Sequence, residues 1–177
     1  MKPRGQMLIV VAILLLVVLI ILAIAIDGGR LLAERARLRR AAQAAADAGT
    51  GLVAEAMVTQ ATARQTQAAA LPTCAPTGPC TPTPELNDVP GWLTDEDRAA
   101  LVAPPMQTQV AAEAIQYAQY NGFPEAEVSY PQGYDPRAPV VRVWVTLRRR
   151  ATILLAGLLG EEWVDLAEPG LSQIPQR

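Results

Sequence analysis

The chain has 177 residues, of which 51% are hydrophobic, and a formal net charge of −2. It contains no histidine, which excludes Ser-His-Asp triads, imidazole acid–base catalysis and histidine metal sites. Two cysteines alone cannot complete a structural zinc site, and the slightly acidic balance does not favour nucleic-acid binding. We therefore expect a protein that is not an enzyme, with no cofactor, no metal, no nucleic-acid partner and no small-molecule substrate.

The first predicted element is a transmembrane helix from Met7 to Ile26, preceded by a short cytoplasmic tail at residues 1–6. This uncharged run is long enough, at ~1.5 Å per residue, to cross a ~30 Å hydrocarbon core. A cleaved secretory signal is the alternative, because the N-terminus is basic and Ala23 and Ala25 form a small-x-small pattern. The length of the run and the helix-forming residues after it favour an uncleaved anchor.

Residues 27–70 lack proline and are rich in alanine, which predicts that the same helix continues outside the membrane. Gly28 and Gly29 are either a hinge or a tolerated weak point in this helix. A packing face of small side chains is predicted at Ala41, Ala45, Ala48 and Leu52. Gln43 points ~200° away from Ala45 by the helical period and is expected to lie on a solvated face.

Residues 71–90 are rich in proline and predict a linker. This segment contains Cys74 and Cys80, which are expected to form a disulfide in an oxidising compartment or to remain two unpaired thiols. The distribution of basic residues argues against an oxidising compartment for these cysteines. More basic residues follow the apolar run than precede it, which favours a cytoplasmic C-terminal side. The arginines that follow it are Arg30, Arg35, Arg37, Arg39 and Arg40.

Residues 91–177 predict a small α+β head with an antiparallel sheet and one or two packed helices. The predicted helices are Asp95–Leu101, with Thr94 as N-cap, and Gln107–Tyr120, ended by Asn121 and Gly122. The predicted strands are Glu127–Tyr130, Val140–Leu147 and an edge strand at Trp163–Ala167; Thr152–Leu159 is a compact apolar segment. Valines alternate with polar residues in the middle strand, so one face of the sheet is expected to lie under a helix. The acidic cluster at Asp95, Glu96 and Asp97 is interpreted as helix-start or surface charge.

Several short sequence patterns occur in the N-terminal and C-terminal parts of the chain. They are Arg4-Gly5-Gln6, Asp27-Gly28-Gly29-Arg30, Leu38 and the run through Asp47-Ala48-Gly49, with a weaker set at Tyr117-Ala118, Asn121-Gly122, Leu158-Leu159-Gly160, Val164 and Ala167. The chain thereby resembles the TadE/TadG-like proteins of tight-adherence pilus assembly. The resemblance implies an inner-membrane anchor, an extracytoplasmic head and pilus-assembly or pilin subunits as partners.

The resemblance also raises prepilin-type cleavage between Gly5 and Gln6. Type IV prepilins carry a glutamate five residues into the mature chain, whereas counting from Gln6 gives Val10 at that position. Gly5 and Gln6 are then only the cytoplasmic edge of the anchor.

Three hypotheses remain at this point. The first is a membrane-anchored, pilin-like structural or assembly component of a surface pilus, with the lipid bilayer and other pilus subunits as partners and incorporation in the filament as one variant. The second is an anchored extracytoplasmic binding module unrelated to pili. The third is a membrane-tethered hydrolase, for which no catalytic pattern is present in the sequence.

Overall fold

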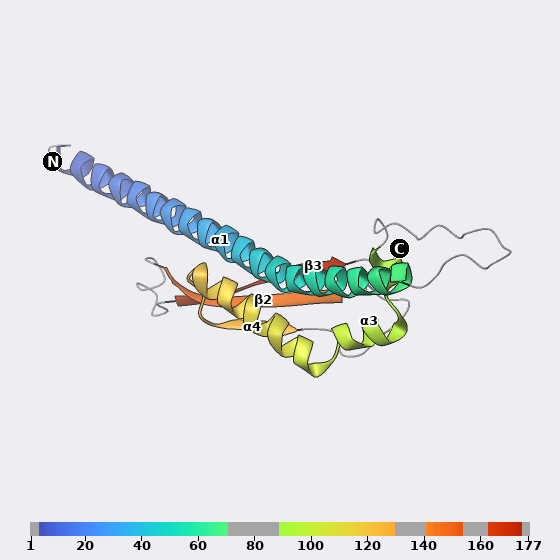
Figure 1. Cartoon of the computed structure of the whole chain (residues 1–177). Coiled ribbons are helices and arrows are strands. Elements are labelled where there is room, and N and C mark those ends of the chain that lie inside the picture. Colours follow the sequence, from blue (N-terminus) through green and yellow to red (C-terminus); the bar gives the residue numbers. More distant parts are fainter. Residues whose placement is uncertain (1–3, 71–88, 130–140, 154–162, 175–177) are drawn as a thin grey trace. The chain divides into compact units, whose positions relative to one another are not determined.

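The computed structural model describes residues 4–70, 89–129, 141–153 and 163–174 of the chain. The elements in order are α1 (Arg4–Ala70), α2 (Val89–Trp92), α3 (Asp95–Leu101), α4 (Pro104–Tyr120), β1 (Ala126–Ser129), β2 (Val141–Thr152) and β3 (Trp163–Ile174). A long N-terminal apolar helix, a three-stranded antiparallel sheet and short helices confirm the predicted α+β class (Figure 1).

The chain divides into two compact units. Unit 1 comprises residues 1–38 and 148–168, and unit 2 comprises residues 39–147 and 169–177. Helix α1 and strands β2 and β3 therefore each contribute residues to both units. The second half of α1 belongs to the same unit as α3 and α4. Most of the predicted linker at residues 71–90 lies outside the described residues, so the boundary after residue 90 stays a prediction.

Helix α1 is unbroken over its 67 residues. Gly28 and Gly29 are helical, and a Cβ atom at either position would meet no other atom within 4 Å. Beyond residue 37 the buried positions recur at three- and four-residue steps, as expected of a helix that packs along one side. They are Leu38, Ala41, Ala42, Ala45, Ala46, Gly49, Thr50, Val53, Met57 and Ala61.

The short helices have well-defined ends. Thr94 is the N-cap of α3, as predicted, and forms a capping box with Asp97. Helix α4 begins at Pro104, three residues before the predicted start, because proline is favoured in the first turn of a helix.

At its other end, α4 stops at Asn121, and Gly122 takes a positive φ of 85°. The Phe123 amide donates to Ala118 O at 2.9 Å and the Gly122 amide to Gln119 O at 2.8 Å, the two bonds of a Schellman motif. The predicted stop signal is thus confirmed, and it turns the 2% exposed Phe123 side chain into the core of unit 2.

The sheet has the order β1-β2-β3, which leaves β1 and β3 as edge strands. Strand β1 pairs with β2 in an antiparallel register that places Val128 opposite Val145. In β2 the alternation is as predicted, with Val141, Val143, Val145 and Leu147 fully buried. The strand was predicted to end at Leu147, but β2 continues to Thr152. The predicted end was too early because three consecutive arginines interrupt the alternation of side chains without ending the strand.

The third strand is also longer than predicted. The edge strand was predicted to end at Ala167, whereas β3 continues through Pro169 and Gly170 to Ile174. An edge strand tolerates proline because the missing amide is not needed on the outer side. Most of the predicted apolar segment Thr152–Leu159 lies outside the described residues.

Candidate functional site

The first feature of the site is the apolar beginning of α1. Its large side chains, from Met7 to Ile26, are 45–74% exposed. By length and composition this is one helix able to cross a membrane, and none of its most apolar window is buried within the protein. An exposed run of leucine, isoleucine and valine fits a lipid environment, because removing such side chains from water is strongly favourable. It is a candidate single membrane span.

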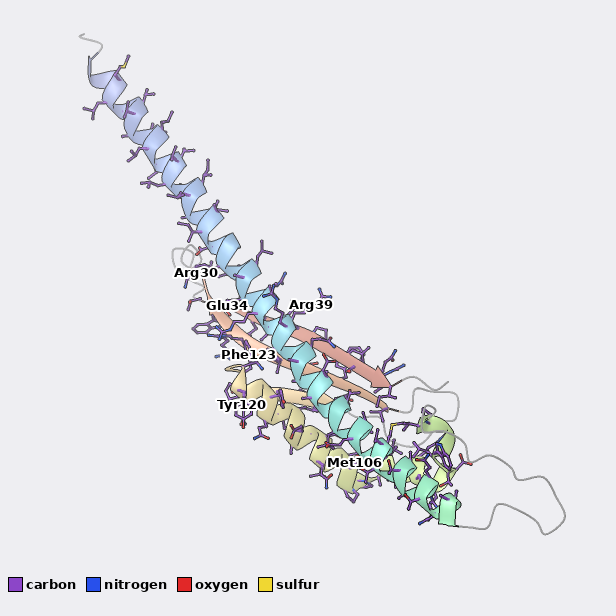
Figure 2. The ribbon with its side chains drawn as sticks, turned by 45° about the horizontal axis from the view of Figure 1, so that its top comes forward. Arg30, Glu34, Arg39, Met106, Tyr120 and Phe123 are labelled. Atoms are coloured by element: carbon purple, nitrogen blue, oxygen red, sulfur yellow. The ribbon has the colours of Figure 1, made fainter. Side chains whose placement is uncertain are left out.

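Polar side chains follow this segment directly. Asp27 is only 5% exposed, one residue after the apolar run ends. Arg30 and Glu34 lie about one and two turns further along α1 (Figure 2). They line a cleft of about 260 Å³ together with Arg149, Arg150 and Thr152 from the end of β2. All of these residues belong to unit 1. The cleft thus contains three guanidinium groups and one carboxylate.

Arginines of unit 1 also take part in ion pairs and in a cation–π contact. Arg149 lies 3.7 Å from Glu34, and Arg35 lies 3.8 Å from Glu168. Arg150 donates from Nε to Asp165 Oδ1 at 3.2 Å and covers the ring of Trp163, with its guanidinium carbon 5.6 Å from the ring centroid. The first two distances exceed a hydrogen bond, so these are loose ion pairs near the surface.

The second half of α1 packs closely because small residues let backbones approach. A Cβ at Gly49 would lie 3.1 Å from Val110 of α4 and 3.2 Å from Val143 of β2. A Cβ at Gly170 of β3 would overlap the backbone of Ala42. These two glycines therefore set the spacing between α1, α4 and the sheet in unit 2.

Gln43 holds α1 to the edge strand by polar contacts. Its Nε2 donates to the carbonyl of Leu171 at 3.0 Å, and its Oε1 accepts from the Leu171 amide at 3.4 Å. The side chain also donates to Asp47 at 3.0 Å. Gln43 is exposed, as expected, but the helical period that gives this direction does not predict its contact with β3.

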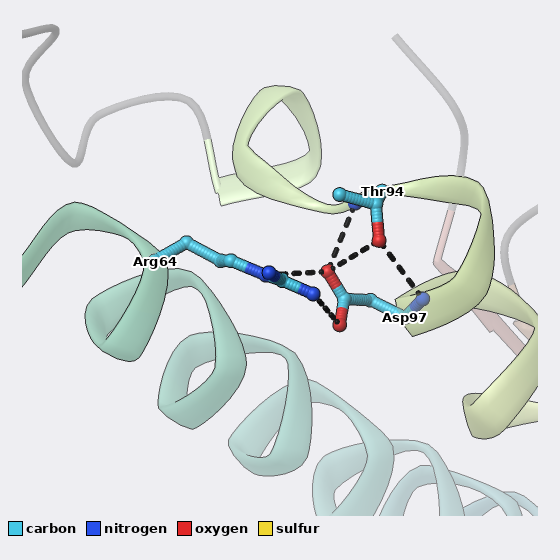
Figure 3. A network of polar contacts seen from close by, with 3 residues as sticks. All are labelled: Arg64, Thr94 and Asp97. Atoms are coloured by element: carbon cyan, nitrogen blue, oxygen red, sulfur yellow. Dashed lines mark hydrogen bonds and ion pairs between the residues drawn. The ribbon is translucent and has the colours of Figure 1, made fainter. Parts of the chain in front are cut away.

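The far end of α1 is joined to α3 by a charged network (Figure 3). Arg64 donates from Nε and Nη2 to the two carboxylate oxygens of Asp97, at 3.1 and 3.0 Å. Thr94 donates to Asp97 Oδ2 from its amide at 3.0 Å and from its hydroxyl at 2.8 Å. The hydrogen bond from Arg64, aided by those from Thr94, lowers the pKa of Asp97 to about 2.

The interpretation of the acidic cluster as helix-start charge is right for Asp97 but incomplete. A Thr-x-x-Asp spacing predicts the cap, whereas no local pattern identifies Arg64, which lies 33 residues away. The same holds for Gly170 and Gln43, whose roles arise from contacts between distant segments.

The predicted packing face of α1 is partly buried. Ala41 and Ala45 are buried, and Ala48 and Leu52 are half-buried beside the stripe. Gly5 and Gln6 lie in the first turn of α1, where nothing tests their cleavage. Cys74 and Cys80 lie outside the described residues, so their pairing stays a prediction. Within the described part of the chain, no group of three acidic, cysteine or histidine side chains is arranged to hold a metal ion.

Comparison with known proteins gives one result. Residues 5–71 match the family model described as putative Flp pilus-assembly TadE/G-like. The resemblance found in the N-terminal patterns is thereby confirmed, and the matched domain suggests a role in Flp, or tight-adherence, pilus assembly. Neither a curated protein nor a solved structure matches the chain significantly.

Proposed function

We propose that this protein is a membrane-anchored, pilin-like structural or assembly component of a tight-adherence pilus. The proposal starts from the match of residues 5–71 to the TadE/G-like family model. The helix anchors it in the cell membrane, with the N-terminus cytoplasmic and the head extracytoplasmic. Its partners are the bilayer and other pilus-assembly or pilin subunits. It acts through packing rather than catalysis.

One observation supports this proposal above the others. A single helix combines an apolar segment that is exposed among the described residues with a small-residue segment that packs against a sheet. An anchor that continues as the helix on which the head packs transmits position and force between a membrane and a subunit. An assembly component requires this mechanical connection.

Fractionation of sheared surface filaments and membranes tests the proposal. We expect the full chain in membranes, in the filament fraction, or in both, and loss of surface filaments when the gene is deleted. A chain that stays in membranes while filaments form normally without it would instead support an anchored binding module unrelated to pili.

Topology is tested separately by a reporter fused after Arg177. We expect activity outside the cytoplasm despite the arginines that follow the apolar segment. Activity of the reporter in the cytoplasm would overturn the proposed orientation and, with it, the assignment of the head to the surface side.

A further inference from the structure

The cleft of unit 1 has the composition of a phosphate site. It is lined by Arg30, Arg149 and Arg150, with Glu34 as the acidic side chain and Thr152 as a hydroxyl. Guanidinium groups bind phosphate oxygens through paired, charge-assisted hydrogen bonds, which lysine cannot reproduce. Three positive charges against one negative charge leave a positive excess in a cleft of about 260 Å³.

Two acidic side chains, Glu34 and Asp165, contact arginines of the cleft, so these five groups keep one positive charge in excess. Glu34 is 3.7 Å from Arg149, and its Oε2 atom is buried without a hydrogen-bond partner. Asp165 contacts Arg150 but is 74% exposed, so water screens this pair. Glu168 is engaged with Arg35, outside the cleft lining. Arg30 has no hydrogen bond or ion pair to any residue that the structure describes.

The position of the cleft along α1 identifies the source of the phosphate. Arg30 follows the last apolar residue, Ile26, by four residues. At ~1.5 Å per residue this places Arg30 about 6 Å beyond the hydrocarbon edge, within the polar headgroup layer, which is about 5 to 8 Å thick on each side.

A neighbouring aromatic residue fits the same depth. Trp163 is 52% exposed and lies under the guanidinium of Arg150. Tryptophan is enriched at the membrane–water interface, where its ring meets lipid and its N–H meets polar groups.

We propose that this cleft binds the phosphate group of an anionic phospholipid in the leaflet on the side of the head. The inference rests on the membrane anchoring in the proposed function. Bound lipid neutralises the juxtamembrane arginines and holds unit 1 at a fixed depth in the membrane.

The test uses the full chain in nanodiscs that contain equal amounts of phosphatidylglycerol and phosphatidylcholine. Native mass spectrometry of the protein released from the discs measures which lipid remains bound. We expect preferential retention of phosphatidylglycerol, and about a fivefold lower preference in Arg30→Gln, since one basic residue near an anionic surface contributes about that factor. Arg30 has no described partner to lose, so this variant should fold normally, which circular dichroism checks.

Arg35→Gln is the control, because it removes the same charge from an exposed side chain of α1 that belongs to unit 1 and lies outside the cleft. Equal loss in both variants would mean general charge attraction and would overturn the site. Displacement of the lipid by millimolar inorganic phosphate in wild type but not in Arg30→Gln would assign the cleft to free phosphate and overturn the lipid source. A chain that inserts without lipid preference refutes only this inference, whereas a chain that fails to insert refutes the anchoring as well.

Discussion

The two halves of α1 follow opposite rules of side-chain size. From Met7 to Ile26 the helix is built largely from leucine, isoleucine and valine, and these side chains are exposed in the protein. From Ala41 to Ala61 the buried face consists mainly of alanine, with Gly49 where α4 and β2 approach. A fluid bilayer adapts to large side chains, whereas a closely packed sheet does not. One helix thus carries bulky side chains along its candidate membrane span and small ones where it packs against protein.

The largest expected effect tests the lipid side of this comparison. Charges in Leu15→Arg/Leu19→Arg would lie near the middle of the candidate span and cost about 5 to 7 kcal/mol of insertion free energy together. We expect most of the protein to leave the carbonate-washed membrane fraction. Leu15→Ala/Leu19→Ala, which removes bulk without adding charge, should remain inserted. Full membrane retention of the arginine variant would contradict the assignment of this segment as a span.

The next effect tests the protein side. In Gly170→Ala the new methyl group would overlap the backbone of Ala42, so α1 and β3 must separate. Overpacking costs about 1 to 3 kcal/mol, and a clash with backbone belongs at the upper end. Gly51→Ala is the control, since a Cβ there meets nothing within 4 Å. Thermal unfolding of the full chain in detergent should show a clear loss for Gly170→Ala and a gain of up to about 1 kcal/mol for Gly51→Ala.

A smaller effect concerns the network at the end of α1. The pKa of Asp97 is lowered to about 2 in the folded chain, below the ordinary unfolded value of ~3.9. Its stabilising contribution is therefore complete above about pH 4 and is lost as the pH falls through about 2, while Arg64 stays charged. Asp97→Asn should lower stability at pH 7 by about 1 kcal/mol, the usual cost of a lost cap, and flatten the acid dependence between pH 4 and 2.

Acid unfolding followed by circular dichroism measures this difference between wild type and Asp97→Asn. Asp95→Asn serves as the control, since Asp95 lies in the same first turn of α3 but outside the capping box. An equal change of acid dependence in both variants would show that the general charge of the helix start, and not the contact with Arg64, is responsible.

The smallest effect tests the polar contact of α1 with β3. Gln43→Ala removes two hydrogen bonds to the backbone of Leu171 at the exposed edge strand. Water replaces them in part, so a loss of about 0.5 to 1 kcal/mol is expected in thermal unfolding. Gln67→Ala, an exposed glutamine of the same helix, should change stability less. Identical melting of the two variants would mean that the edge contact contributes nothing.

The sequence by itself determined the features that depend on neighbouring residues. The apolar segment, the continuation of α1, the Thr94 cap, the Asn121-Gly122 stop and the alternation in β2 all arise from local periodicity or local backbone preference. The patterns at Gly5-Gln6 and from Asp27 to Gly49 were enough to indicate the TadE/G-like family.

The tertiary structure alone decided how the distant segments meet. Gly170 lies beyond the predicted end of the strand and is the point where β3 passes the backbone of Ala42. Gln43 looked solvated and binds Leu171, 128 residues away; Arg64 and Asp97, and the arginines around the cleft, come together in the same way. The physical reason is common to all of them: these interactions depend on how α1 is positioned against the sheet and against α3, and that position is set by packing that no short window of sequence contains.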